Sequence, residues 1–196
     1  MSPIKASEWA CPTFAIPKKD KTIRVVSDFR GLNRIIKRKP YPVPLIQDIM
    51  PSIVKFRYVT AINLVMGYYS MGLAKNAKEK CMICLSWGLY QYEVLPMGLI
   101  VSSDVFQEAM GNLMLDLENV YCYLDDIIVI GNSSFQDHIA QVDEVLSRLK
   151  EKGMQIHLRK SAWARDSVEY LGYIIGRDGI RPQTKKIQGI RKLLKK

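Results

Sequence analysis

The sequence has no apolar run long enough to cross a membrane, which takes about 18 consecutive apolar residues in a helix. Its most apolar stretch, around Ile127, is short and begins with two acidic residues. A secretory signal peptide, internal repeats and low-complexity segments are also absent. These absences exclude a transmembrane helix and a repeat architecture. They predict an intracellular protein, cytoplasmic or nuclear, that is not secreted and not bound in a membrane.

Cysteine and histidine, the side chains that bind most transition metals, are scarce: the chain has four cysteines and two histidines. Cys81 and Cys84 have the CxxC spacing, but no second pair exists and neither His138 nor His157 is near them in sequence. A zinc or redox site is therefore disfavoured. We expect the thiols to be reduced and buried, as in intracellular proteins.

Acidic residues are in deficit. The 196 residues include 19 Asp and Glu against 29 Lys and Arg, which gives a net charge of +10 and a pI near 9.4. This balance predicts a polyanionic partner, although a basic protein kept in solution by its charge would show the same value. Apolar residues make up 48% of the chain, which is enough to bury a core, so disorder is not expected.

The order of the predicted elements indicates an α+β fold in which two helices cover one face of an antiparallel sheet. Apolar alternation predicts strands at 13–17, 23–27, 58–64, 90–95, 121–124, 127–130, 154–158 and 168–175. One helix is predicted to follow a capping box of Asp104 and Gln107, and a second to run from Ser134 to Gly153. RNA-binding sheets and polymerase palms share this arrangement, so topology alone does not decide the function.

Local chemistry predicts the remaining segments. Ser2 and Pro3 show no sign of a helix or strand with a partner in view. The stretch from Pro40 to Pro44 must be extended, because proline fixes its own φ and restricts the residue before it. We interpret it as a connector between two lobes. A short helix is expected near 46–53, a turn at 178–179 and a basic amphipathic segment at 185–196.

Asp125 and Asp126 lie inside an apolar run that extends from Val120 to Ile130. Burying ionised carboxylates without partners is heavily unfavourable, so the two acids must protrude at a hairpin tip or meet a cation. A polar two-residue turn is the simpler interpretation. Glycine or asparagine would suit such a turn better, however, because the favoured short turns need φ > 0. Turn geometry alone therefore does not account for two acids.

Phosphoryl transfer to a 3′-hydroxyl requires such a cluster, because carboxylates on neighbouring strands hold two hard cations about 4 Å apart. A third carboxylate is usually needed, on an adjacent strand and ahead of an aromatic residue that packs on the incoming sugar. The stretch from Ala61 to Tyr69 has that form, but it offers Asn63 in the acidic position.

Tyr123-Leu-Asp-Asp126 resembles the YxDD box of reverse transcriptases, and its neighbours follow in family order from about Ser7 to Lys186. The best match is the gypsy-like LTR-retrotransposon type. Further resemblances are to the family's fingers motif, its linker, the first palm motif, the motif under template and nucleotide, and the primer grip; they lie at 18–33, 41–44, 63–68, 95–107 and 170–173.

The resemblance implies roles for individual residues. Asp125 and Asp126, with Asn63 in place of the expected aspartate, would hold two Mg²⁺ ions, with Mn²⁺ as an alternative. Lys160 is the candidate general acid. The implied nucleotide-binding residues are Lys18, Arg24, Tyr68, Met97 and Gln107, of which Tyr68 would be the steric gate that excludes a 2′-hydroxyl. Tyr170, Leu171 and Gly172 would form the primer grip.

The implied partners are an RNA or DNA template with its primer strand and a dNTP. The implied domains are a fingers part with a linker at 1–57, a palm at 58–181 that encloses a further fingers segment at about 72–100, and the start of a thumb at 182–196. The thumb and RNase H parts are expected elsewhere in a longer polyprotein.

Asn63 is the departure that matters for activity. A carboxylate offers two anionic oxygens, whereas an amide offers one neutral oxygen and turns an NH₂ group toward the cations. The sequence therefore predicts an RNA-directed DNA polymerase with impaired activity. Two alternatives remain open: a catalytically inactive nucleic-acid-binding remnant of such a domain, and a small RNA-binding sheet domain. The last gives no reason for adjacent acids at a hairpin tip.

Overall fold

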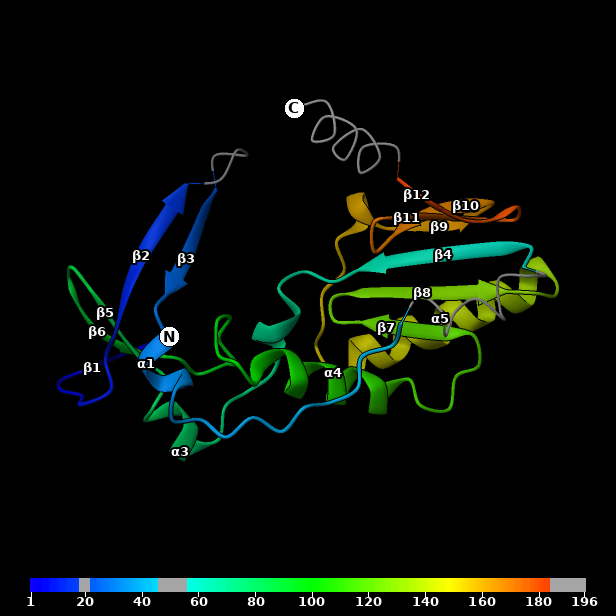
Figure 1. Cartoon of the computed structure of the whole chain (residues 1–196). Coiled ribbons are helices and arrows are strands. Elements are labelled where there is room, and N and C mark those ends of the chain that lie inside the picture. The colour runs from blue at the N-terminus through cyan, green and yellow to red at the C-terminus, as the bar shows by residue number, and fades with distance from the viewer. Residues whose placement is uncertain (18–21, 46–55, 184–196) are drawn as a thin grey trace, which may run out of the picture. The chain divides into compact units, whose positions relative to one another are not determined.

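The computed structural model describes residues 1–17, 22–45 and 56–183. Lys18, the helix expected at 46–53 and the segment at 185–196 lie outside the described residues. The chain divides into two compact units, Met1–Pro42 with Met66–Glu108 and Val43–Val65 with Ala109–Lys196. Both combine helices with largely antiparallel sheets, so the α+β class predicted from the sequence is confirmed (Figure 1).

The first unit contains a five-stranded sheet in the order β1-β6-β5-β2-β3. Its strands are β1 (Ser2–Ile4), β2 (Cys11–Pro17), β3 (Ile23–Ser27), β5 (Met82–Leu85) and β6 (Gly88–Gln91). Strand β1 pairs with β6 through Ser2 and Gln91, so the expectation that Ser2 and Pro3 have no strand partner was wrong. Strands β2 and β5 run parallel.

The same unit contains short helices. They are α1 (Arg30–Asn33), the 3-10 helix η1 (Gly67–Ser70) and α3 (Lys75–Lys78). The buried core of the unit draws on the loop before α1, on α1 itself and on β5; its members are Phe29, Leu32, Cys81, Ile83, Tyr92 and Leu99. Burial raises the pKa of the Cys81 thiol to about 11, so this cysteine is a neutral core residue at physiological pH.

The second unit is built on a four-stranded antiparallel sheet in the order β7-β8-β4-β9. Its strands are β4 (Tyr58–Asn63), β7 (Val120–Tyr123), β8 (Asp126–Gly131) and β9 (Ala162–Arg165). The central strand β8 is buried from Ile127 to Gly131, which explains its continuous apolar sequence. A three-stranded sheet of β10 (Ser167–Tyr170), β11 (Tyr173–Gly176) and β12 (Gly179–Pro182) completes the unit.

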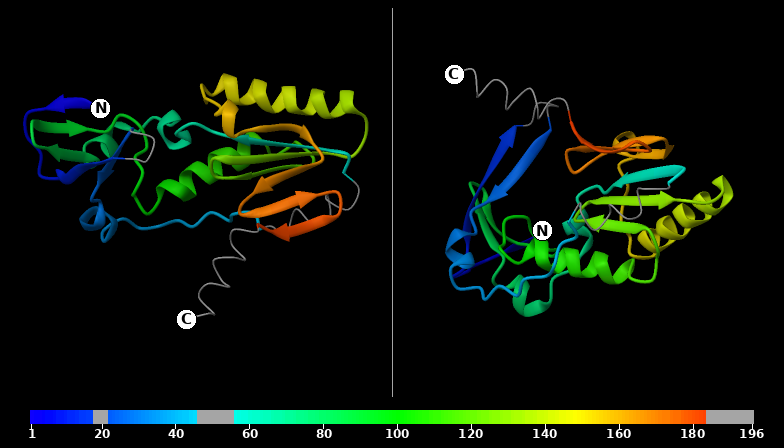
Figure 2. Two further views of the ribbon diagram at one scale, coloured as in Figure 1. Left: turned by 90° about the horizontal axis from the view of Figure 1, so that it is seen from above. Right: turned by 45° about the vertical axis from the view of Figure 1, so that its right-hand side comes forward.

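Helix α5 (Phe135–Glu151) packs against β8 and β4, and it lies alongside the sheet in the two views of Figure 2. The predicted boundaries are confirmed. Ser134 caps the first turn in a capping box with Asp137, and Gly153 adopts φ +66° just past the end. Helical spacing predicts one apolar face made of Phe135, Ile139, Val142, Leu146 and Leu149. This face is partly wrong, because Phe135 and Ile139 are 46% and 44% exposed while His138 is buried.

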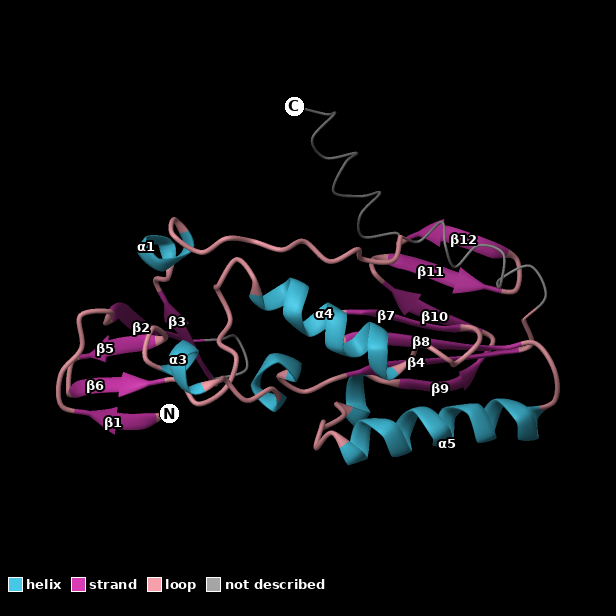
Figure 3. Cartoon of the chain, turned by 90° about the horizontal axis from the view of Figure 1, so that it is seen from below, coloured by secondary structure: helices cyan, strands magenta, loops and turns pink. Residues whose placement is uncertain are grey.

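Helix α4, labelled in Figure 3, spans Ser102–Leu113 and so begins earlier than predicted. Asp104 lies inside its first turn and does not form the expected capping box with Gln107. Its carboxylate instead accepts hydrogen bonds from the Arg38 guanidinium at 2.6 and 3.0 Å and from the Tyr41 backbone N–H at 3.2 Å. Arg38 holds the pKa of this buried carboxyl below its usual range, and the contact fastens the connector segment to α4.

Two strand predictions in the C-terminal half need correction. At 154–158 the structure has only an isolated bridge between Ile156 and Leu64, followed by a 3-10 helix η2 (Leu158–Lys160). The strand predicted at 168–175 is two strands, β10 and β11, because Leu171 (φ +48°) and Gly172 (φ +79°) form a turn between them. In the described part of the chain, no helix combines the length and the apolar character needed to cross a membrane.

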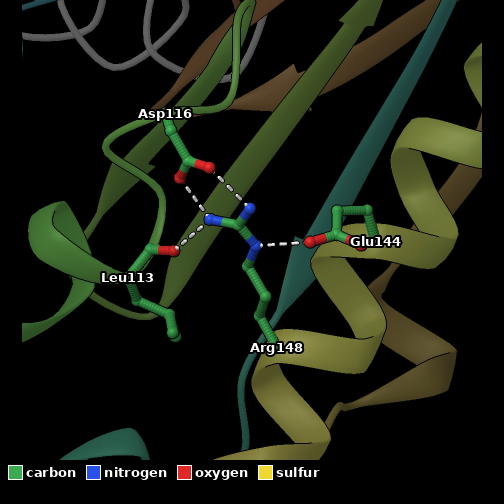
Figure 4. Close-up of polar contacts among 4 residues, drawn as sticks. All are labelled: Leu113, Asp116, Glu144 and Arg148. Carbon is green, nitrogen blue, oxygen red and sulfur yellow. Dashed lines mark hydrogen bonds and ion pairs between the residues drawn. The ribbon is translucent and has the colours of Figure 1, made fainter.

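Arg148 on α5 ties the loop after α4 to the helix (Figure 4). Its guanidinium contacts both carboxylate oxygens of Asp116, donates to the Leu113 carbonyl at 2.9 Å and pairs with Glu144 at 2.7 Å. Hydrogen bonds from Arg148 lower the pKa of Asp116 to about 2. One planar side chain therefore satisfies acceptors on three residues, from the end of α4, the loop after it and α5.

Arg148→Met is expected to lower the temperature of unfolding by roughly 2 to 4 °C, because the Leu113 carbonyl and both carboxylates lose their shared donor. The unfolding temperature of Arg148→Lys should lie between those of Arg148→Met and the unmodified chain, since an ammonium group cannot reproduce the forked hydrogen bonds of the guanidinium. Differential scanning calorimetry measures the shift. Arg159→Met is the matched control at an exposed arginine. Equal losses in both methionine variants would show that Arg148 is not a structural clamp.

Candidate active site

Asn63 and Asp126 face each other across the sheet of the second unit. Asn63 is the last residue of β4, Asp126 is the first of β8, and the antiparallel register pairs them directly. The Asn63 Nδ2 donates a hydrogen bond to Asp126 Oδ1 at 2.5 Å. The structure therefore brings together two of the three side chains predicted to form the catalytic cluster.

The backbone around Asn63 is held on several sides. Its N–H donates to Ser161 Oγ at 3.1 Å, and its carbonyl accepts from the His157 N–H at 2.7 Å. The next residue, Leu64, donates its N–H to the Asp125 carbonyl at 2.8 Å. These bonds fix the end of β4 beside the hairpin that carries both aspartates.

That hairpin joins β7 to β8 by a two-residue turn, since Tyr123 and Asp126 form the last pair of the ladder. Leu124 takes the left-handed conformation, with φ +51°, which costs roughly 1 kcal/mol or more for a residue with a branched side chain. The turn thus places a positive φ on Leu124, whereas neither aspartate has one. Strain of this kind is found most often at functional sites.

Tyr170, predicted for the primer grip, belongs to the core of the second unit and is 3% exposed. Burial raises its pKa, and its hydroxyl donates a long hydrogen bond of 3.4 Å to the Asp126 carbonyl. The ring therefore supports the aspartate hairpin from within. Of the three predicted primer-grip residues, Leu171 and Gly172 are the ones at the turn. Lys160, the candidate general acid, is exposed at the end of η2.

His138 is a residue whose importance the sequence did not reveal. It is 1% exposed, and its Nε2 lies 2.8 Å from Thr60 Oγ1, which also accepts from the Ala164 N–H at 3.0 Å. The ring stacks on Tyr58 with 5.9 Å between centroids. This buried contact joins α5, β4 and β9 behind the strand that ends at Asn63. The only signal for the role of His138 is its contact with Thr60, and that contact depends on the pairing of segments far apart in the sequence.

Burial lowers the pKa of His138 below the value of about 6.5 for an exposed imidazole. Above that pH both folded and unfolded chains carry a neutral imidazole. Below it the unfolded chain binds a proton that the folded chain resists, so the free energy of unfolding should fall, by at most about 1.4 kcal/mol per pH unit. Urea unfolding between pH 8 and 5 measures this. The slope should diminish in His138→Gln and persist in His157→Gln; the same slope in both would contradict the assignment.

The residues predicted to bind the nucleotide belong to the first unit. Arg24 is exposed on β3, opposite Ile16 on β2. Tyr68 lies in η1 and packs on Phe106, with ring centroids 4.9 Å apart. Met97 is 45% exposed, whereas Gln107 is buried at 1% and cannot touch a ligand directly in this conformation.

The donor set has two of the three carboxylates that usually hold a pair of Mg²⁺ ions, and an amide in place of the third. In the described ranges no three His, Cys, Asp or Glu side chains are placed to hold a metal ion. Asn63 directs its NH₂ group at Asp126, so it presents a donor where a cation needs an anionic oxygen. The site therefore supplies two adjacent acids, Asp125 and Asp126, beside an amide.

Known proteins with related sequences share one domain. The sequence model of the family described as "Reverse transcriptase (RNA-dependent DNA polymerase)" matches residues 16–175. The Pol polyprotein from transposon gypsy of Drosophila melanogaster is 31% identical over 192 residues, which covers 94% of this chain and 18% of the polyprotein. The transposon Tf2-3 polyprotein of Schizosaccharomyces pombe is 29% identical, covering 92% of the chain and 14% of the polyprotein. The chain thus spans less than a fifth of these relatives.

Solved structures give a matching fold. The foamy viral protease-reverse transcriptase in complex with RNA/DNA hybrid superposes with a TM-score of 0.84 at 23% identity, covering 95% of this chain and 25% of that one. A dRH form of the same protein, in complex with double-stranded DNA, gives a TM-score of 0.86 at 23% identity, covering 95% and 33%. At this identity the likeness shows the fold, and it confirms the predicted fingers-and-palm architecture.

Proposed function

The chain belongs to the reverse transcriptase (RNA-dependent DNA polymerase) family, and from this premise we propose that it is the fingers and palm part of a retrotransposon polymerase whose nucleotidyl transfer is weakened by Asn63. The observation that carries the proposal is the pairing of Asn63 with Asp126 beside the turn that holds Asp125. The catalytic scaffold is retained, and one of its acidic positions is an amide.

Asp125 and Asp126 are the residues that would hold Mg²⁺ or Mn²⁺. Such a cation, when bound, stabilises charge on the attacking and leaving oxygens of phosphoryl transfer. Asn63 works against this, because its NH₂ group occupies Asp126 Oδ1 and adds no negative charge. The chain's own contribution is to fix the hairpin: Tyr170 supports it from the core and the Leu64 N–H fastens its turn.

The proposed partners are a template with its primer strand and a dNTP. The net charge of +10 favours binding to nucleic-acid phosphates, and the foamy viral relatives of the same fold were solved with RNA/DNA hybrid and double-stranded DNA. Because the attraction acts through phosphates, the affinity for nucleic acid should fall steeply with salt concentration, since salt cations compete with the protein's lysines and arginines for the phosphates. Tyr68 is proposed as the residue that selects a deoxyribose, with Phe106 holding its ring.

Primer extension on an RNA template tests the function, with gel-shift binding of the same primer–template measured alongside. We expect salt-sensitive binding and slow extension that depends on Mg²⁺ or Mn²⁺. Asp125→Asn should abolish the residual extension and leave binding intact. Extension that is insensitive to Asp125→Asn, or the absence of any salt-sensitive binding, would contradict the proposal.

A second candidate function is a nucleic-acid-binding remnant that has lost catalysis altogether. The direct hydrogen bond from Asn63 to Asp126 favours it, because this bond gives Asp126 Oδ1 a partner without any cation. The two functions are separated by whether an acid at position 63 restores activity.

A further inference from the structure

The first unit contains a pocket that none of the proposed catalytic or nucleotide-binding residues lines. Its volume is about 430 Å³, within the range of small-molecule sites in proteins. Three stretches of the unit form its wall: α1 with the residue Ile36, the segment around α3, and the residues from Leu95 to Val105. The wall is predominantly apolar; its larger side chains are Leu32, Ile36, Met71, Leu73, Leu95 and Leu99.

Only two lining side chains are polar by nature, Asn76 and Lys80, and no carboxylate lines the pocket. The neighbouring Lys78 is engaged by Glu93, whereas Lys80 is exposed and makes no ion pair within the described residues. Cys81 adds a neutral, apolar thiol to the wall, because burial keeps it protonated. The pocket therefore combines an apolar interior with a single positive charge.

We propose that this pocket binds an amphipathic monoanion, with an apolar chain against the leucines and a carboxylate paired with Lys80. An apolar body of this kind gains from leaving water, and a charge-assisted hydrogen bond to the ammonium fixes its orientation. A neutral ligand of the same length lacks the charge-assisted hydrogen bond, and a cationic ligand is repelled by the Lys80 ammonium. This inference does not depend on the catalytic competence of the second unit.

The pocket wall also supports the loop that carries Met97. Leu95 and Leu99 line the pocket on either side of Met97 and Gly98, and the Asn33 side chain ties the Gly98 carbonyl and the Ile100 N–H at 2.9 Å each. A ligand in the pocket therefore contacts the base of this loop. Binding should reduce hydrogen exchange at Leu95 and Leu99.

The test is calorimetric titration of the full chain with decanoate, kept below its micellar concentration, and with decanol and decyltrimethylammonium. We expect decanoate to bind at one site, roughly tenfold or more tighter than decanol, with no binding of the cation. Lys80→Gln should remove the preference for decanoate over decanol. Lys75→Gln, at an exposed lysine of α3 that does not line the pocket, is the matched control and should preserve it.

A filling variant tests the location independently. A Cβ added at Gly72, which lines the pocket, would meet no atom within 4 Å, so a side chain can begin there without a backbone clash. Gly72→Leu should therefore weaken decanoate binding, and its unfolding temperature is measured alongside. Gly31 also has no atom within 4 Å and lies outside the pocket, so Gly31→Leu is the control. Equal affinity for decanoate and decanol, no binding at all, or equal losses in the two leucine variants would each overturn the proposal.

Discussion

Replacing Asn63 with aspartate is expected to raise the rate of Mg²⁺-dependent primer extension by roughly 10²- to 10⁴-fold. The Asn63 amide donates a hydrogen bond to Asp126 Oδ1 and so competes with a cation for that oxygen. Aspartate at position 63 would replace this donor by an anionic oxygen that can itself bind the cation. Each ~1.4 kcal/mol of transition-state stabilisation is worth a factor of ten, and a bridging carboxylate supplies several kcal/mol. Single-nucleotide incorporation on a fixed primer–template measures the rate.

Two variants separate the new acid from the lost amide. Asn63→Ala frees Asp126 Oδ1 without adding a carboxylate, so its rate should rise far less than that of Asn63→Asp. The double change Asn63→Asp with Asp126→Asn keeps the net charge and moves the amide to the opposite strand, and it should remain slow. An unmodified chain that incorporates nucleotides as fast as Asn63→Asp would refute the role given to Asn63.

Gly131→Ala is expected to destabilise the chain by about 1 to 3 kcal/mol. A Cβ at this position would lie 2.5 Å from His138 Nδ1 and 2.9 Å from the His138 Cβ and Cγ atoms. The imidazole cannot easily move away, because it is buried and its Nε2 lies 2.8 Å from Thr60 Oγ1. Glycine at the end of β8 therefore makes room for the histidine. Urea unfolding at pH 8 measures the loss.

A double-mutant measurement distinguishes the clash between a Cβ at position 131 and His138 from a general loss of stability. Combining Gly131→Ala with His138→Ala should cost less than the sum of the two single losses, because the smaller side chain removes the collision. Gly31→Ala in α1 has no atom within 4 Å of its new Cβ, and it should be neutral or slightly stabilising. Additive losses at positions 131 and 138 would contradict the close packing.

The sequence predicts the local part of the candidate site. Adjacent acids inside an apolar run indicate a hairpin tip, and Tyr123 and Asp126 do close the last pair of the β7–β8 ladder. The capping box at Ser134 and the left-handed Gly153 were also predictable, because each depends on residues within one turn of the helix. Patterns of this range are encoded in adjacent residues.

Contacts between distant segments were not predictable in the same way. Strand β1 has three residues and pairs with β6 near position 91, so no pattern of neighbouring residues predicts it. No local pattern indicates the burial of His138, because it depends on Thr60 and Gly131 from two strands. Asp104 was predicted to cap a helix, but Arg38 and Tyr41, more than sixty positions away, compete for its carboxylate. In each case tertiary pairing overrides a reasonable local preference.

The resemblance of the Asn63 segment to a palm motif placed an amide where an acid is usual, but it could not show what the amide does. That required the register of β4 against β8, which sets Asn63 opposite Asp126. The roles of Lys160, Arg24, Met97 and the primer-grip turn remain predictions. Each role is tested by substituting the residue and measuring primer extension, with Asp125→Asn as the reference for a chain that has lost catalysis.

Mn²⁺ binding, followed by electron paramagnetic resonance, measures the effect of Asn63 on the metal site without any substrate or complete polymerase. We expect Asn63→Asp to bind Mn²⁺ at least roughly tenfold more tightly than the unmodified chain, and adding Asp126→Asn to reverse the gain. Equal Mn²⁺ affinity in the unmodified chain and in Asn63→Asp would contradict this expectation.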